Sequence, residues 1–98
     1  MDIYHAAKKV LGTLDILYPV LFTWKLKVKR VAEGTSGLAD IDYEKMTATI
    51  TISSSLKEDD VTEVCCHEWA HLLAATERNA HGPLWGAAYG LCYQSLLD

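Results

Sequence analysis

Cysteine is scarce in this 98-residue chain, and its three copies are poorly placed for disulfide bonds. Cys65 and Cys66 are adjacent and Cys92 makes the count odd, which argues against the disulfide framework of a small secreted domain. None of them has the Cys-x-x-Cys spacing of a zinc ribbon. We therefore expect free thiols and a protein that resides in the reducing cytoplasm.

Long apolar runs are also missing. In the N-terminal stretch MDIYHAAKKVLGTLDILYPVL the hydrophobic residues are interrupted by Asp2, His5, Lys8, Lys9 and Asp15. A signal peptide or a membrane span needs a longer unbroken apolar segment, so we expect neither. Basic residues are in the minority, nine against thirteen acidic ones, and the net charge of -4 argues against broad nucleic-acid binding.

Repeats and low-complexity tracts are absent from the sequence, and 98 residues leave room for one hydrophobic core. Half of the residues are hydrophobic, which is enough to bury a modest core. We expect a single domain over residues 1–98, at a size where a bound metal ion adds useful stability.

Hydrophobic periodicity predicts helices and strands in the order α-β-β-β-α-α. Steps of three and four residues over 3–17 predict an amphipathic helix, and the alternation in FTWKLKVKR predicts a strand. A short strand over 37–41, a turn over 42–45 and a longer strand over 46–53 complete a small antiparallel sheet of about three strands. The basic face of the first strand is expected to be solvated, although nucleic acid or an acidic partner is possible there; this face carries Lys25, Lys27, Lys29 and Arg30.

Two further helices follow the sheet. Ser55 and Glu58 match a capping box and predict a helix from Leu56 to about Thr76, and Pro83 is well placed as the first residue of the last helix. One side of this last helix would carry Leu84, Trp85, Ala88, Tyr89, Cys92 and Leu96. The predicted fold class is therefore α+β, with an N-terminal helix, the sheet, an active-site helix and a C-terminal helix.

The segment HEWAHLLAATERNAHGPLW, residues 67–85, has the spacing of a metal site. Residues four apart lie on the same face of a helix, so His67 and His71 can point their imidazoles at one ion. Two histidines, one further protein ligand and an open position for water suit a catalytic zinc. Glu68 lies beside His67 and would act as the general base that deprotonates the water.

His81 is the preferred third ligand. It follows a loop and immediately precedes the last helix, so the chain can fold back and present its ring. Glu77 comes only six residues after His71 and would point elsewhere, while Asp98 is the last residue. We expect His5 at the surface and one Zn²⁺ per chain.

HEWAHLL followed by HGPLW resembles the SprT-like metalloproteases, a family that includes Spartan and the WLM and YgjP-like groups. The preceding GLADIDYEKMTATITISSSL is similar to the strands and turn before their active-site helix, so the resemblance covers roughly residues 21–97. It implies a minimal zincin-like fold with Trp85 packed under the site, Glu68 as catalytic base and zinc bound by His67, His71 and His81. The loop before His81 is shorter than in Spartan-type members, and the sequence carries no zinc ribbon, DNA-binding module or ubiquitin-binding tail. Their role in cutting proteins crosslinked to DNA is therefore not implied.

The sequence favours a zinc-dependent metallopeptidase acting on a protein or peptide substrate. The alternative is a zinc-stabilised, non-catalytic binding or regulatory module, and a metal-free helical interaction domain is the third possibility. Tyr43, Tyr89 and Tyr93 are candidates for donating a hydrogen bond to an oxyanion, but the spacing does not select among them, and we expect packing in the core or at its rim as the default. The strand over 46–53, directly before the active-site helix, is the expected edge for pairing with an extended substrate.

Overall fold

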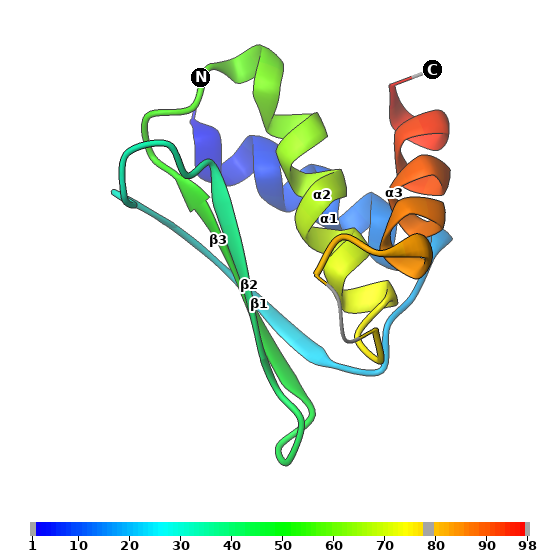
Figure 1. Ribbon diagram of the computed structural model, residues 1–98. Coiled ribbons are helices and arrows are strands. Elements are labelled where there is room, and N and C mark those ends of the chain that lie inside the picture. The colour runs from blue at the N-terminus through cyan, green and yellow to red at the C-terminus, as the bar shows by residue number, and fades with distance from the viewer. Residues whose placement is uncertain (1, 78–79, 98) are drawn as a thin grey trace.

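A three-stranded sheet with all of the helices on one side forms the frame of the protein (Figure 1). The computed structural model describes residues 2–77 and 80–97. The elements are α1 (Ile3–Leu17), β1 (Thr23–Lys29), β2 (Gly37–Asp42), β3 (Thr47–Ser53), the 3-10 helix η1 (Glu58–Asp60), α2 (Val61–Leu73) and α3 (Pro83–Leu96). The predicted order and the α+β class are confirmed.

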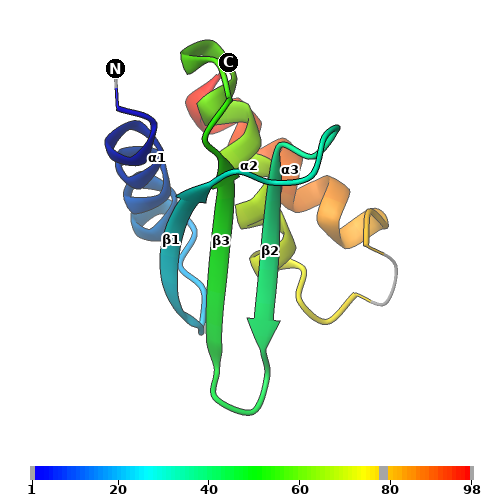
Figure 2. The ribbon, with the colours of Figure 1, turned by 90° about the vertical axis from the view of Figure 1, so that its left-hand side faces the viewer.

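The sheet is mixed, so the prediction of an antiparallel sheet is wrong for one pair of strands. Its order is β1-β3-β2, with β1 parallel and β2 antiparallel to β3 (Figure 2). The short turn after Asp42 places β3 beside β2, and the connection over 30–36 is long enough to leave a place for β3 next to β1. β3 is therefore the central strand and not the predicted edge; β1 and β2 are the two edges.

The turn between β2 and β3 is stabilised by its first acidic side chain. Asp42 Oδ1 accepts hydrogen bonds from the backbone N–H groups of Glu44 and Lys45, at 3.1 and 3.0 Å. Such a side-chain turn lets the chain reverse within a few residues, which brings β3 back along β2.

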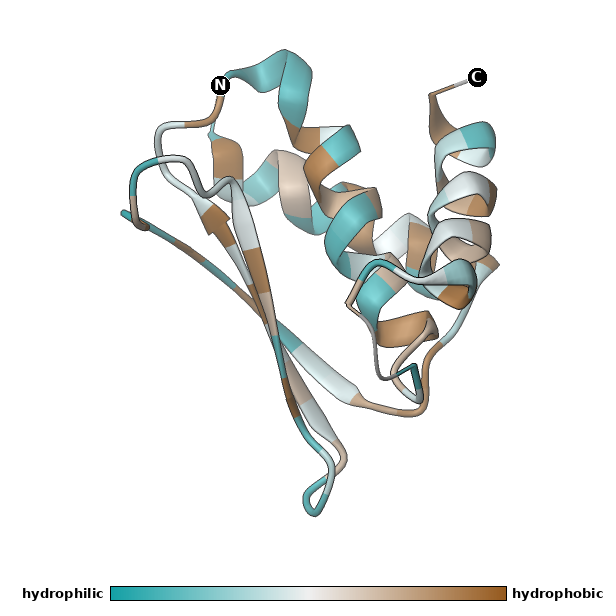
Figure 3. Cartoon of the chain, viewed as in Figure 1, coloured by the Kyte–Doolittle hydropathy of each residue, from teal (hydrophilic) through white to brown (hydrophobic). Residues whose placement is uncertain are grey.

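One face of the sheet packs against α1 and α2, and the other face is uncovered (Figure 2). Hydrophobic and hydrophilic residues alternate along β1, as predicted (Figure 3). The core combines Ala48, Ile50 and Ile52 of β3 with Leu11 and Leu14 of α1 and with the buried side of α2. At its centre Trp69 is fully buried, donates its Nε1–H to the carbonyl of Tyr18 at 3.0 Å and meets Trp24 edge to face.

The exposed face of β1 carries the predicted basic stripe of Lys25, Lys27 and Lys29. β3 presents hydroxyl side chains beside it, and Asp40 of β2 lies in the same row as Lys25, on the far side of Thr49. Basic and acidic residues are thus separated across the uncovered sheet face. A role for this face in nucleic-acid binding stays a prediction.

The start of α2 differs from the predicted capping box. Ser55 hydrogen-bonds through its hydroxyl to the hydroxyl of Ser53, at 2.9 Å, and Lys57 has an extended backbone. The helix begins at Val61 after η1 and ends at Leu73, so both predicted ends are displaced. Serine side chains that bond to each other and to nearby backbone compete with helix formation, which explains the late start.

α3 begins at Pro83, as predicted, and packs against α2. Its side towards α2 contains fully buried Cys92 and half-buried Trp85 and Tyr89, whereas Leu84, predicted on the same side, is 55% exposed. All three cysteines are free and buried, which confirms the expectation of free thiols. Within residues 2–77 and 80–97, no helix has the length and apolarity needed to cross a membrane.

Candidate metal centre

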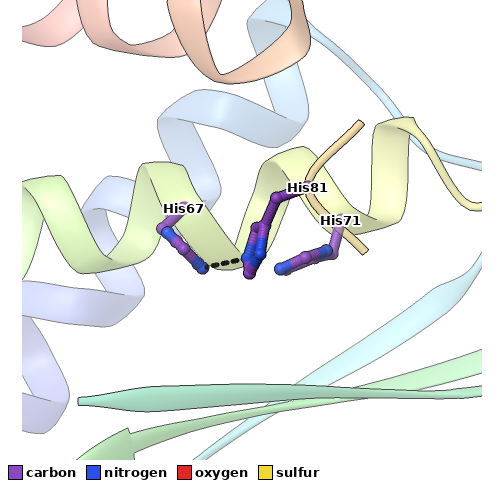
Figure 4. A group of neighbouring side chains, drawn as sticks. All are labelled: His67, His71 and His81. Atoms are coloured by element: carbon purple, nitrogen blue, oxygen red, sulfur yellow. Dashed lines mark hydrogen bonds between the residues drawn. The ribbon is translucent and has the colours of Figure 1, made fainter. Parts of the chain in front are cut away.

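Three histidine rings converge on the side of α2 that faces the strands (Figure 4). His67 and His71 lie one turn apart on α2, and His81 comes from the segment directly before α3. One nitrogen of each ring lies within 4.8 Å of the corresponding nitrogens of the other two, and the Nε2 atoms of His67 and His81 are 3.2 Å apart. The structure thus brings together the three histidines that the sequence predicts as ligands.

The spacing of these nitrogens fits a small tetrahedral ion. Nitrogens bound to zinc at 2.0–2.1 Å in tetrahedral geometry lie about 3.3 Å from each other. The distance of 3.2 Å between Nε2 of His67 and Nε2 of His81 matches this value, and a nitrogen of His71 lies within 4.8 Å of a nitrogen of each of these rings. Imidazole donors suit several divalent metal ions, among them zinc, copper, iron and nickel.

The surroundings of His67 and His71 favour the neutral form of both rings. Partial burial lowers the pKa of His67 below its ordinary value of 6.5, and the nearby His81 lowers it further, while Glu63 acts in the opposite direction. For His71, burial comes first, followed by His67 and His81, and each of these lowers its pKa. Metal ions bind the neutral imidazole, so this clustering prepares the rings for coordination at neutral pH.

Glu68 is the one buried acidic side chain at the site, among the residues that the structure describes. It is only 4% exposed, and its Oε2 lies 4.0 Å from Nε2 of His67. Burial raises the pKa of its carboxyl from 4.5 to about 7. A carboxyl group with such a pKa can take up and release a proton near neutral pH, which is what a general base requires.

Trp85 of α3 forms a wall of the site. Its ring centroid lies 4.9, 5.8 and 4.7 Å from those of His67, His71 and His81, and its Nε1–H donates to the carbonyl of His67 at 3.2 Å. Tyr89 stacks on its other side at 5.1 Å. Trp85 therefore packs against all three imidazoles.

Two cavities meet at this site, and both are lined by Gly37, His67 and Glu68. The first, of about 540 Å³, extends past Glu63 towards the loop over 34–37. The second, of about 390 Å³, extends along β2 towards Tyr43 and the segment that carries His81. Together the two cavities form a groove that extends in two directions from His67 and Glu68, with residues of β2 along one wall.

The three candidate tyrosines occupy different places. Tyr89 is nearest the site, with its ring 6.2 Å from that of His67, and its hydroxyl donates to Glu63 at 3.5 Å. Tyr43 lines the second cavity and donates to the carbonyl of Ala75 at 2.8 Å, whereas Tyr93 contacts Tyr89 and lies farther out. Any role for these hydroxyl groups in catalysis stays a prediction.

The sequence did not indicate what Glu77 does. Its carboxylate is not one of the groups in the cluster of His67, His71 and His81, and accepts hydrogen bonds from the backbone N–H groups of Leu84 and Trp85, at 2.8 and 3.1 Å. The sequence feature that could have predicted this role is an acidic residue, Glu77, shortly before a helix that begins with Pro83. His5 is exposed and contacts Asp2 at 2.8 Å, far along the chain from the cluster.

Comparison with known proteins agrees with this architecture at the level of the fold. No protein-family model and no curated protein sequence matches the chain. Its fold is similar to that of one solved metallopeptidase structure. The structural similarity is to the crystal structure of the metallopeptidase zymogen of Methanocaldococcus jannaschii, jannalysin, with a TM-score of 0.57 and 15% sequence identity over 100% of this chain and 84% of that chain.

Proposed function

We propose that the protein is a zinc-dependent metallopeptidase of the SprT-like type. The observation that carries this proposal is the placement of three clustered imidazoles and a buried carboxyl group, Glu68, where two cavities meet. The metallopeptidase-type fold supports it, and so do the HEWAHLL and HGPLW segments. The three buried free thiols are consistent with our further proposal of a cytoplasmic location.

His67, His71 and His81 would hold the ion, with Trp85 limiting the movement of their rings. A zinc ion held there would supply Lewis acidity, the property that polarises a carbonyl group and lowers the pKa of a water molecule. Glu68 would accept the proton from this water as it attacks, and then pass the proton to the nitrogen of the departing amine. Its pKa of about 7 suits both the uptake and the release of that proton.

The substrate would bind as an extended peptide along β2. β2 is an edge strand, so the backbone groups on its outer side are not used by another strand of the described sheet. Gly37, Leu38, Ala39 and Ile41 of this strand also line the second cavity, next to His67 and His71. A peptide that pairs with β2 would therefore run past the imidazoles and Glu68, with its scissile bond near the ion.

The proposal is tested by measuring bound zinc and peptide cleavage in the same preparations. Wild type should bind one zinc per chain and cut an unfolded protein such as casein. Glu68→Gln should keep the zinc and lose about 10²- to 10⁴-fold in cleavage rate, because only the general base is removed. His81→Ala should bind zinc far more weakly, because three protein ligands become two.

His5→Ala is the matched control, because it removes a histidine that lies outside the cluster. It should behave as wild type in both measurements. Retained cleavage by Glu68→Gln would refute the mechanism. Stoichiometric zinc with no cleavage of any substrate would support the non-catalytic binding module, and absence of zinc from wild type would remove both metal-based functions.

A further inference from the structure

The carboxylate of Glu77 connects the end of α2 to the first turn of α3, on either side of the segment that carries His81. We propose that Glu77 is a positioning residue for this third metal ligand. The inference rests on the proposed metal site but not on peptidase activity. Glu77 lies just after the last turn of α2, where its backbone N–H donates to the carbonyl of Ala74 at 2.9 Å. Its carboxylate spans from there to the first turn of α3.

The hydrogen bonds made by this carboxylate replace an ordinary N-cap. Gly82, the N-cap residue of α3, has no side chain that accepts a hydrogen bond, and Pro83 has no N–H to donate. The first free donors of the helix are therefore the N–H groups of Leu84 and Trp85, and Glu77 accepts from both with separate oxygens. The next N–H, of Gly86, already bonds to the carbonyl of Gly82 at 2.9 Å. A negative charge at this end of a helix also interacts favourably with the helix dipole.

These bonds connect Glu77 to the metal centre through Trp85. The backbone N–H of Trp85 is held by Glu77, while its indole N–H donates to the carbonyl of His67. The same indole lies 4.7 Å from the ring of His81, which is exposed to solvent. The other ring contacts of His81 in the described structure are with His67 and His71, the rings that it would join at the ion, so its position depends on how the ends of the segment between Glu77 and Trp85 are held together.

The absence of a side chain at Gly82 leaves room for the carboxylate of Glu77. A Cβ atom at position 82 would lie 2.7 Å from both Cδ and Oε1 of Glu77 and 2.9 Å from Oε2. The carboxylate would have to move, and it would then lose its bonds to Leu84 and Trp85. Replacement of Gly82 by alanine should therefore have the same effect as removal of the Glu77 carboxylate, although it leaves every hydrogen-bonding group in place.

The expected consequence is weaker zinc binding. Loss of a residue that orients a metal ligand typically reduces metal affinity about 10- to 100-fold. We expect a reduction of this size in Glu77→Ala and in Gly82→Ala, and a smaller one in Glu77→Gln, whose amide oxygen still accepts one of the two hydrogen bonds.

The test is a double-mutant cycle on the zinc dissociation constant, measured by competition with a chromophoric chelator. The double variant Glu77→Ala/Gly82→Ala should bind zinc no more weakly than either single variant, because the added methyl group no longer meets a carboxylate. Leu14→Ala is the control for general destabilisation, since it opens a cavity in the core at a residue of α1 and leaves Glu77, Gly82 and Trp85 unchanged. It should lower the melting temperature of the zinc-free protein and leave zinc affinity unchanged.

The proposal would be overturned by wild-type zinc affinity in Glu77→Ala, or by single-variant losses that add fully in the double variant. A reduction of zinc affinity by Leu14→Ala equal to that of Glu77→Ala would also overturn it, because the effect would then be one of stability alone. If Glu77→Ala does not fold, Gly82→Ala and Glu77→Gln decide the question. Wild type that binds zinc but cuts no peptide would refute the peptidase function and leave the role of Glu77 standing.

Discussion

The buried carboxyl group of Glu68 should make the stability of the zinc-free protein depend on pH. Burial raises its pKa from 4.5 to about 7, so the folded protein holds this proton more tightly than the unfolded chain. Its stabilising contribution is fully present below pH 4.5 and is lost as the pH rises through the folded-state value of about 7. Glu68→Gln removes the titrating group while keeping the size of the side chain.

The magnitude follows from the two pKa values. Together they correspond to about 3 kcal/mol of unfolding free energy in total, of which about 2.5 kcal/mol falls between about pH 5 and about pH 8. Over this range the unfolding free energy of Glu68→Gln should therefore rise by about 2.5 kcal/mol relative to that of wild type.

The assay is urea unfolding of both proteins in excess chelator, followed by tryptophan fluorescence, because Trp69 is fully buried when the chain is folded. His67 and His71 have lowered pKa values, so their contributions act in the opposite direction and are lost as the pH falls. Both proteins retain these histidines, so their contributions largely cancel in the comparison. A difference between the two proteins that stays constant with pH would show that Glu68 is solvated, and the argument for a general base with a raised pKa would fail.

Three further predictions concern the core, the metal and the approach of β2 to the base. Trp69→Ala should lower the unfolding free energy by about 3–5 kcal/mol in urea unfolding followed by far-ultraviolet circular dichroism, because a fully buried indole is removed. Zinc at a hundredfold excess over its dissociation constant should stabilise the folded protein by about 2.7 kcal/mol, and chelator should reverse this in a calorimetric scan; an unchanged transition would contradict the metal site. In Gly37→Ala the new Cβ would lie 3.0 Å from Oε2 of Glu68 and 3.1 Å from the backbone oxygen of Thr51, so the base should shift. We expect the kcat of Gly37→Ala for peptide cleavage to fall about tenfold or more while zinc is retained. An unchanged kcat would show that Glu68 tolerates the contact.

Much of the secondary structure could be predicted because each element has its own periodicity. The three- and four-residue steps of α1 and the two-residue alternation of β1 are local properties, and the structure confirms both. Pro83 at the start of α3 was predictable for the same reason, since its ring favours the first turn of a helix. The start of α2 was not, because Ser53 and Ser55 bond to each other in preference to the helix.

The pairing of strands could not be derived from alternation. A buried face and a solvated face define how a strand is oriented towards the core, but they do not define its neighbours or their direction. The insertion of β3 between β1 and β2 makes β2 the edge beside the histidines, and with it the surface along which we place the substrate.

By itself, the sequence determined the helix that aligns His67, Glu68 and His71, because residues four apart on a helix must share a face. It also identified His81 as the histidine able to return to them. Only the tertiary structure decided how that return is made, with the Glu77 carboxylate closing the segment and Gly82 leaving room for it. Such contacts depend on distances between segments, which the spacing of residues along a chain does not contain.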